Sequence, residues 1–136
     1  MTLVREAMVT EPAALEVTAS AQEAGELLAR PEVRAVFVTR DEQLAGVVTR
    51  KTLVREVVAP GLDPRATTLG EIAEEPYLAL EGGMELENAF WVLEERDLER
   101  VPVVEDGRLV GVLSRAVIQR RLVEEERAEE DEDSSG

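Results

Sequence analysis

Apolar and polar positions along the chain follow two different periods. Alternating or short continuous apolar runs are typical of strands, and apolar residues three and four positions apart are typical of helices. Strand-like runs lie at residues 13–17, 35–39, 44–48, 77–81, 100–104 and 109–113. Helix-like spacing lies at residues 20–30, 50–58, 84–96 and 115–126, with shorter helical lead-ins at residues 3–8 and 69–73. After each lead-in, the predicted order of elements is β-α-β-β-α, and this order occurs twice.

Polar residues at the ends of these runs agree with the predicted boundaries. Ser20 followed by Glu23 is a capping box, the pattern that opens a helix. Thr49 and Ser114 stand where the N-caps of the helices after the third strand of each unit belong. The pair Asp106-Gly107 tolerates positive φ and predicts a tight hairpin turn.

The two units are related by an internal repeat. LAGVVTRKTL at residues 44–53 matches LVGVLSRAVI at residues 109–118, and Gly46 and Gly111 are 65 positions apart. The segment at residues 59–67, with two prolines and a glycine, reads as a linker. The sequence therefore predicts repeat 1 at residues 1–58, the linker at 59–67 and repeat 2 at 68–123.

The size of each unit predicts how the two repeats associate. Three strands and two helices enclose too small a core to be secure alone, whereas two related units can bury apolar faces against each other. We expect an α+β fold in which tandem β-α-β-β-α repeats pack sheet to sheet with pseudo-twofold symmetry.

Composition removes several classes of function. The chain has no cysteine and no histidine, so thiolate zinc sites and a histidine general base are excluded, and no metal site is expected. A net charge of −15 repels nucleic acid and anionic membrane surfaces. With no apolar run long enough for a signal peptide or a membrane span, a cytoplasmic protein without a membrane partner is expected.

Charge is concentrated at the C-terminus. Between Glu124 and Asp133 there are eight acids and one arginine, Arg127. Such a run repels itself and buries little apolar area. The sequence predicts an acidic disordered tail at residues 124–136 that serves solubility more than docking.

The repeat resembles the CBS (cystathionine-β-synthase) domain, whose third strand leads through G-h-h-[ST]-x-x-D (h apolar) into an apolar helix. The matching residues are GVVT at 46–49 and GVLS at 111–114, and VPVV at 101–104 matches the preceding strand. The resemblance covers about residues 3–123. It implies a CBS pair, or Bateman module, with two clefts between the repeats and a disc-shaped homodimer formed through helices.

The resemblance also implies where a ligand would bind. In the family, adenine nucleotides or related adenosyl ligands often occupy the clefts, so AMP, ATP or S-adenosylmethionine is the implied class of ligand, and no cofactor is required. By position, the implied ligand-binding residues are Thr49, Arg50, Lys51, Thr52, Ser114, Arg115, Val36, Val101 and Pro102. Thr52 and Val117 stand where the family has the aspartate that holds ribose, and this departure weakens the implied nucleotide site. Plain helix capping remains the alternative role for the two hydroxyl residues Thr49 and Ser114.

One helix carries more apolar residues than a single buried face needs. Residues 84–96 include Phe90 and Trp91 on a wide apolar arc, which suggests a second covering surface. Phe90 and Trp91 are therefore the candidate dimer interface. A Trp91 half-buried within its own repeat is the alternative.

Three functions compete on these grounds. We expect a non-catalytic regulatory CBS-pair module that dimerises, senses an adenosine-containing or other anionic small ligand, and acts on a separate target protein. A ligand-free dimerisation or protein-docking module is the alternative, since a fold does not fix a function. An enzyme is disfavoured because carboxylates such as Glu94 and Glu95, adjacent on a helix, do not face each other.

Overall fold

The computed structural model describes the backbone of residues 1–135 and the side chains of residues 1–130. The helices and strands follow the predicted order, and the α+β fold with two tandem repeats is confirmed. Repeat 1 consists of α1 (Val4–Ala7), β1 (Ala14–Glu16), α2 (Ala21–Leu28), β2 (Val36–Arg40), β3 (Gln43–Val48), α3 (Arg50–Leu53) and the π-helical segment η1 (Val54–Val58). Repeat 2 consists of α4 (Leu69–Ile72), β4 (Leu80–Glu81), α5 (Leu86–Arg96), β5 (Arg100–Glu105), β6 (Arg108–Ser114) and α6 (Arg115–Ser135).

The strands form one sheet whose order reads the same from both ends. The order is β1-β2-β3-β6-β5-β4, with the first strand of each repeat parallel to the second and the third antiparallel to the second. A register shift follows Val38 in β2 and Val103 in β5, 65 positions apart. These matched irregularities support a pseudo-twofold relation between the repeats.

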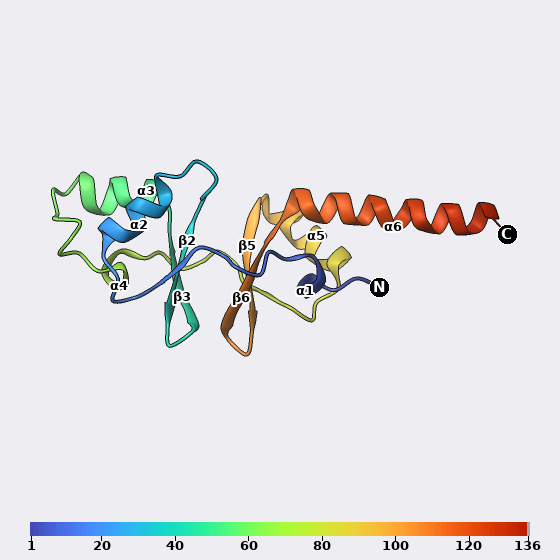
Figure 1. The fold of residues 1–136 in the computed structure, drawn as a ribbon, viewed down its shortest axis with the longest axis horizontal. Coiled ribbons are helices and arrows are strands. Elements are labelled where there is room, and N and C mark those ends of the chain that lie inside the picture. The colour runs from blue at the N-terminus through green and yellow to red at the C-terminus, as the bar shows by residue number, and fades with distance from the viewer. Residues whose placement is uncertain (136) are drawn as a thin grey trace.

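The two hairpins meet only at their turns. The Leu44 N–H donates to the Gly107 carbonyl at 3.0 Å, and the Leu109 N–H donates to the Glu42 carbonyl at 3.2 Å. Figure 1 shows the hairpins β2–β3 and β5–β6 side by side in the middle of the molecule, with α2, α3 and α4 at one end and α1, α5 and α6 at the other. Residues of both hairpins line the cleft described below.

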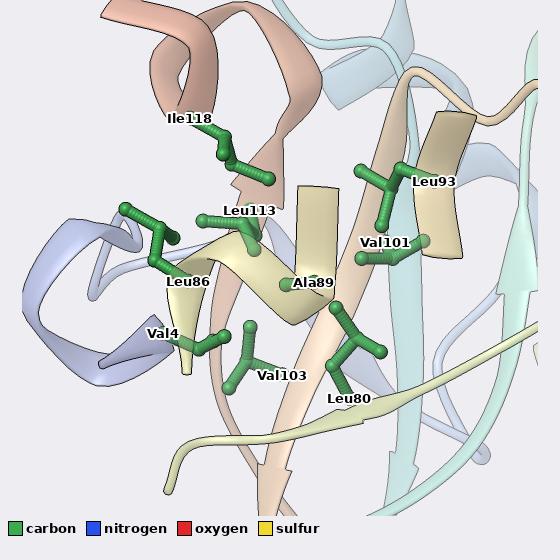
Figure 2. Packing of buried hydrophobic residues seen from close by; sticks show 9 residues of the cluster. All are labelled: Val4, Leu80, Leu86, Ala89, Leu93, Val101, Val103, Leu113 and Ile118. Atoms are coloured by element: carbon green, nitrogen blue, oxygen red, sulfur yellow. The ribbon is translucent and has the colours of Figure 1, made fainter. Parts of the chain in front are cut away.

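The apolar core is divided into two clusters, each under the helices of one repeat. The lead-in helices are exchanged between these clusters. Val4 of α1 is fully buried in the cluster of repeat 2, where Figure 2 shows it between Leu86 and Val103. Leu69 and Ile72 of α4 lie in the cluster of repeat 1. The core of each repeat is thus completed by the short helix that precedes the strands of the other repeat in the sequence.

The segments after the exchanged helices continue across to the opposite hairpin. Val9 forms a β-bridge with Val112 of β6, and Glu74 forms one with Val47 of β3. Gly46 of β3 allows this approach, because a Cβ atom there would lie 2.8 Å from the Cβ of Ala73.

The C-terminal segment differs from the prediction made from the sequence. Residues 124–135, predicted as disordered, continue α6 as a helix, and Gly136 lies outside the described residues. Glutamate, arginine and alanine are good helix formers, and a helix already nucleated at Ser114 grows at little further cost. The Thr2 hydroxyl also donates to the Glu125 carboxylate and ties this helix to the N-terminal segment. Among residues 1–135, no helix has the length and apolar content required to span a bilayer.

Candidate functional site: the cleft between the repeats

A cleft of about 660 Å³ lies between the two repeats. Its walls come from the segments that precede β1 and β4, from the hairpin strands, and from the loops that follow α2 and α5. The lining reflects the pseudo-twofold relation, since it includes Pro12 with its counterpart Pro76 and Val47 with its counterpart Val112. The cleft is therefore a shared site, built from both repeats.

The two walls differ in charge. Three of the cations in the lining, Arg30, Arg34 and Lys51, belong to repeat 1, and Lys51 is the only lysine of the chain. Repeat 2 contributes one cation, Arg100, and a largely apolar wall of Pro76, Tyr77, Leu78, Leu98, Val101, Pro102 and Val112. Four glutamates, Glu11, Glu32, Glu74 and Glu75, also line the cleft. Four cations against four acids make the cleft far less negative than the rest of a molecule with a net charge of −15.

On the repeat 1 side, the hydroxyls of Thr49 and Thr52 bind each other. The Thr52 N–H donates to the Thr49 hydroxyl at 3.3 Å, and the Thr49 N–H donates to the Thr52 hydroxyl at 3.0 Å. The two hydroxyl oxygens are 3.1 Å apart. This reciprocal capping box opens α3. Thr49 is half-buried on the wall of the cleft, whereas Thr52 is fully buried and does not line it.

Two other residues implied on this side support the wall from behind. One guanidinium nitrogen of Arg50 donates to the carbonyls of Arg30 and Val33, both at 2.8 Å. Arg50 thus holds the loop that carries the cleft cations Arg30 and Arg34. Val36 is fully buried in the core of repeat 1.

On the repeat 2 side, the polar residues implied by the resemblance are engaged elsewhere. The Ser114 hydroxyl accepts from the Val117 N–H at 3.2 Å, which caps α6. Arg115 forms ion pairs with Glu94 at 3.4 Å, with Asp97 at 3.3 Å and with Glu99. The hydrogen bond that Arg115 donates to Glu99, assisted by the negative charges of Glu99, Asp97 and Glu94, raises the pKa of the Arg115 guanidinium against the opposing effect of burial. Neither Ser114 nor Arg115 lines the cleft.

The structure therefore brings together Thr49, Lys51, Val101 and Pro102 of the residues implied from sequence. It sets Arg50, Thr52, Val36, Ser114 and Arg115 apart from the cleft lining. This asymmetry concentrates the candidate polar contacts on the repeat 1 wall.

Sequence reasoning missed Arg34 and Tyr77 as cleft residues. Tyr77, the only tyrosine, is 86% exposed and lies three residues before β4, although the apolar run predicted it within a strand. Tyr77 reaches the cleft because the β-bridge between Glu74 and Val47 holds the segment before β4 against repeat 1. The sequence feature that could have indicated a role for Tyr77 is its position as a solitary aromatic residue directly after Pro76.

The outer face of repeat 2 carries the aromatic pair predicted as an interface. Phe90 is half-buried and packs against the core of its own repeat, whereas Trp91 is 60% exposed. Their rings are 5.5 Å apart and meet edge to face at 68°. Trp91 thus presents much of its indole on the surface of α5.

Known proteins similar to this chain share its repeated architecture. The CBS domain family model matches residues 4–59 and 69–124. Hypoxic response protein 1 of Mycobacterium tuberculosis is 36% identical over 84 residues, which cover 62% of this chain and 59% of that protein. The chain therefore aligns with less than two thirds of that relative's length. The CBS domain-containing protein YhcV of Bacillus subtilis is 26% identical over 114 residues, which cover 84% of this chain and 81% of that protein.

Solved structures show the same fold. A crystal structure of hypoxic response protein I with two coordinated zinc ions matches 89% of this chain and 99% of that chain, with a TM-score of 0.75 and 28% identity. A crystal structure of CBSX2 in complex with AMP matches 93% of this chain and 99% of that chain, with a TM-score of 0.73 and 23% identity. CBS-pair proteins are regulatory modules. The duplicated sequence motif, the palindromic sheet and the family match together establish that this chain belongs to the CBS domain family, with one CBS domain in each repeat.

Proposed function

We propose that this chain is a non-catalytic regulatory module that binds an adenosine-containing or other anionic small ligand in the cleft between its repeats. The observation that carries the proposal is the distribution of cations in the cleft, with Lys51, Arg30 and Arg34 from repeat 1 and only Arg100 from repeat 2, whose other lining residues are apolar apart from Glu74 and Glu75. An anionic group would meet the cations, and a flat base would lie against Tyr77 and Pro102. AMP bound to CBSX2, a protein of the same fold, supports this class of ligand.

The residues implied from sequence have two kinds of role, contact with the ligand and support of the residues that make that contact. Lys51 contacts the anionic group, and Thr49, Val101 and Pro102 form the surrounding wall. Arg50 positions the loop with Arg30 and Arg34, and Thr52 orients Thr49 through the capping box. Ser114 and Arg115 hold the start of α6 on the apolar side.

Binding of AMP, ATP and S-adenosylmethionine, measured by calorimetry, tests the proposal. We expect Lys51→Met to weaken the ligand that binds by about tenfold or more, since a hydrogen bond to a charged group contributes about 1.5–3 kcal/mol. Arg65→Met, in the exposed linker and outside the cleft lining, is the matched control and should bind as the parent chain does. Absence of affinity below millimolar for all three compounds would refute an adenosine-containing ligand.

The single lysine offers a second measurement. An acylating reagent can modify only Lys51 and the α-amino group, because the chain has no other lysine. Bound ligand should slow the modification of Lys51 relative to that of the α-amino group. Equal rates with and without a saturating ligand would place that ligand outside the cleft.

A ligand-free dimerisation or docking module is the second candidate. It is favoured by one observation, namely that the hydroxyls of Thr49, Thr52 and Ser114 are all used in helix capping. In either case we propose that the chain forms a homodimer through the surface around Phe90 and Trp91 and acts in the cytoplasm on a separate target protein. Sedimentation should give twice the chain mass of 15.0 kDa for the parent protein, and a smaller mass for Trp91→Glu.

A further inference from the structure

The cations of the repeat 1 wall have no cationic equivalents in repeat 2. The 65-residue offset of the internal repeat assigns each of them a counterpart. The counterparts are acidic or uncharged, and the pairs are Arg30 with Glu95, Arg34 with Glu99, and Lys51 with Ala116. Three positive charges in repeat 1 therefore correspond to two negative charges in repeat 2. The pseudo-twofold relation holds for the backbone, but the charge is reversed at this place.

On the repeat 1 side, the loop before β2 is held against the start of α3. Arg50 makes this contact through its hydrogen bonds to the carbonyls of Arg30 and Val33, and Lys51 is the next residue of α3. Among the residues whose side chains the structure describes, none of Arg30, Arg34 and Lys51 forms an ion pair. Their charges are available to a ligand in the cleft.

One of the four glutamates that line the cleft is already neutralised. The carboxylate of Glu74 pairs with Arg55 of η1. Counted with that partner, the lining has four cations against three remaining acids. The excess of positive charge favours an anionic group, and the position of the cations places that group on the repeat 1 side.

The equivalent residues of repeat 2 form a separate hollow. It has a volume of about 460 Å³ and is lined by Glu94, Asp97, Glu99, Arg115, Ala116 and Gln119. Half of these residues are counterparts of cleft residues, namely Asp97 of Glu32, Glu99 of Arg34, and Ala116 of Lys51. The hollow is thus the pseudo-twofold equivalent of the cationic part of the cleft.

Carboxylates of the chain itself take the place of an anion in this hollow. Arg115 is the counterpart of Arg50, but it binds side-chain carboxylates where Arg50 binds backbone carbonyls. Its guanidinium pairs with Glu99, with Asp97 at 3.3 Å and with Glu94 at 3.4 Å. Three acids around one arginine leave a net negative charge, and like charges repel. A second anion is therefore disfavoured in repeat 2.

The size of the cleft also favours a single ligand. Its volume is about 660 Å³. Pockets of about 300–1,000 Å³ typically enclose one drug-sized molecule. An adenosine-containing molecule whose anionic group lies against the repeat 1 loop leaves the largely apolar wall of repeat 2 for its base.

We infer that the cleft holds one adenosine-containing ligand per chain, with its anionic group against Arg30, Arg34 and Lys51, and that Glu99 and Asp97 exclude a second anion from the equivalent hollow in repeat 2. This inference rests on the proposed ligand binding and adds its stoichiometry and its orientation. The two repeats have diverged into one that binds the anion and one that supplies its own.

Titration calorimetry of the parent chain with AMP, ATP and S-adenosylmethionine measures the number of sites. We expect about one molecule per chain for each compound that binds, because the cleft has room for a single ligand. Two molecules per chain would overturn this inference and leave the proposed ligand binding intact. Absence of binding for all three compounds would refute the proposed adenosine-containing ligand, and this inference with it.

The orientation is tested at Arg34. Arg34→Met should weaken binding at least about tenfold, because a charge-assisted contact to the anionic group is lost. Arg96→Met, at an exposed position of α5 outside the cleft lining, is the matched control and should bind as the parent chain does. An unchanged affinity of Arg34→Met would overturn the assigned orientation.

Neutralising the internal carboxylates should open a second site. Asp97→Asn together with Glu99→Gln preserves side-chain size, and asparagine tolerates the positive φ of 53° at position 97. We expect about two molecules per chain, the second bound more weakly, because Arg115 is then able to bind an external anion.

A matched control separates this effect from a general change in charge. Glu129→Gln together with Glu130→Gln, at exposed positions of α6, makes the same change in net charge and should still give about one molecule per chain. A double variant at Asp97 and Glu99 that keeps the circular dichroism spectrum of the parent and still binds one molecule would overturn the role assigned to these carboxylates.

Discussion

Thr52 is one of the two residues, with Val117, at which this chain departs from the family pattern. It is fully buried, and its hydroxyl accepts the Thr49 N–H at 3.0 Å. An aspartate in its place would bury a carboxylate, which is costly unless the charge is paired. The threonine keeps the polar contact that opens α3 and avoids that cost. The same side chain is thereby withdrawn from direct contact with a ligand.

We predict that Thr52→Val lowers the free energy of unfolding by about 1–2 kcal/mol, because the Thr49 N–H loses its acceptor while side-chain volume is preserved. Urea denaturation measures this change. Thr18→Val, at an exposed position, is the control and should alter the free energy of unfolding by no more than about 0.5 kcal/mol. A Thr52→Val protein as stable as the parent would show that the capping box does not contribute to the free energy of unfolding.

Gly46 is required by the close approach of the segment after α4. A Cβ atom at this position would lie 2.8 Å from the Cβ of Ala73 and 3.0 Å from the Glu74 carbonyl oxygen. We predict that Gly46→Ala costs about 1–3 kcal/mol of stability through this overlap. At Gly83, where the nearest atom would be the end of the flexible Arg5 side chain at 3.5 Å, alanine should be neutral or slightly stabilising. Thermal denaturation of both variants compares the two sites, and an equal effect would contradict the overlap.

At the scale of elements, Arg115 joins the end of α5 to the start of α6. Its guanidinium binds Glu94 in α5 and both Asp97 and Glu99 in the loop that follows. Because these carboxylates raise its pKa, Arg115 stays charged throughout the neutral pH range. Its stabilisation is present at neutral pH, and on the alkaline side it is lost only as the pH rises through the raised pKa of Arg115. Ionic strength is therefore a better variable than pH for measuring it.

We predict that Arg115→Met lowers the melting temperature at low salt, and that the difference from the parent shrinks at 1 M salt, where the screening length is about 3 Å. Arg108→Met is the control, because Arg108 pairs only loosely with Glu42, at 3.7 Å and with both side chains exposed. Scanning calorimetry at two salt concentrations measures both effects. A difference that is equally large in high salt would indicate lost packing in place of lost charge.

At the scale of the whole molecule, the exchanged lead-in helices make each repeat depend on the other. Val4 of α1 is buried in repeat 2, and Leu69 of α4 is buried in repeat 1. The repeats are therefore not independent folding units, although each has its own core. A change at one wall of the cleft has a direct structural route to the opposite repeat.

This exchange predicts crossed effects of two core substitutions. Val4→Ala should cost about 2 kcal/mol and raise amide hydrogen exchange mainly in β5 and β6, whereas Leu69→Ala should cost about 2–5 kcal/mol and raise it mainly in β2 and β3. Hydrogen-exchange mass spectrometry resolves the two repeats. If Val4→Ala instead loosened repeat 1, the exchange of helices would be wrong.

The sequence predicted the strands, the helix caps and the duplication because these are local properties. Thr49 caps α3 as its position suggests, and Asp106 and Gly107 both adopt the positive φ expected of their turn. The candidate site was less predictable. Thr49 and Lys51 line the cleft, but Arg115, an equivalent of Arg50, is drawn instead into a carboxylate cluster made by a separate helix and loop. Which neighbours surround a charged side chain is decided by tertiary packing.

The sequence by itself determined that the chain contains two CBS repeats, since a motif repeated at one offset fixes the order of elements without reference to their contacts. It did not determine that residues 124–135 continue as helix, because charge repulsion and helix propensity oppose each other along that segment. Only the tertiary structure decided which repeat each lead-in helix completes. A short amphipathic helix fits either apolar core, and the choice follows from the path of the chain between the two hairpins.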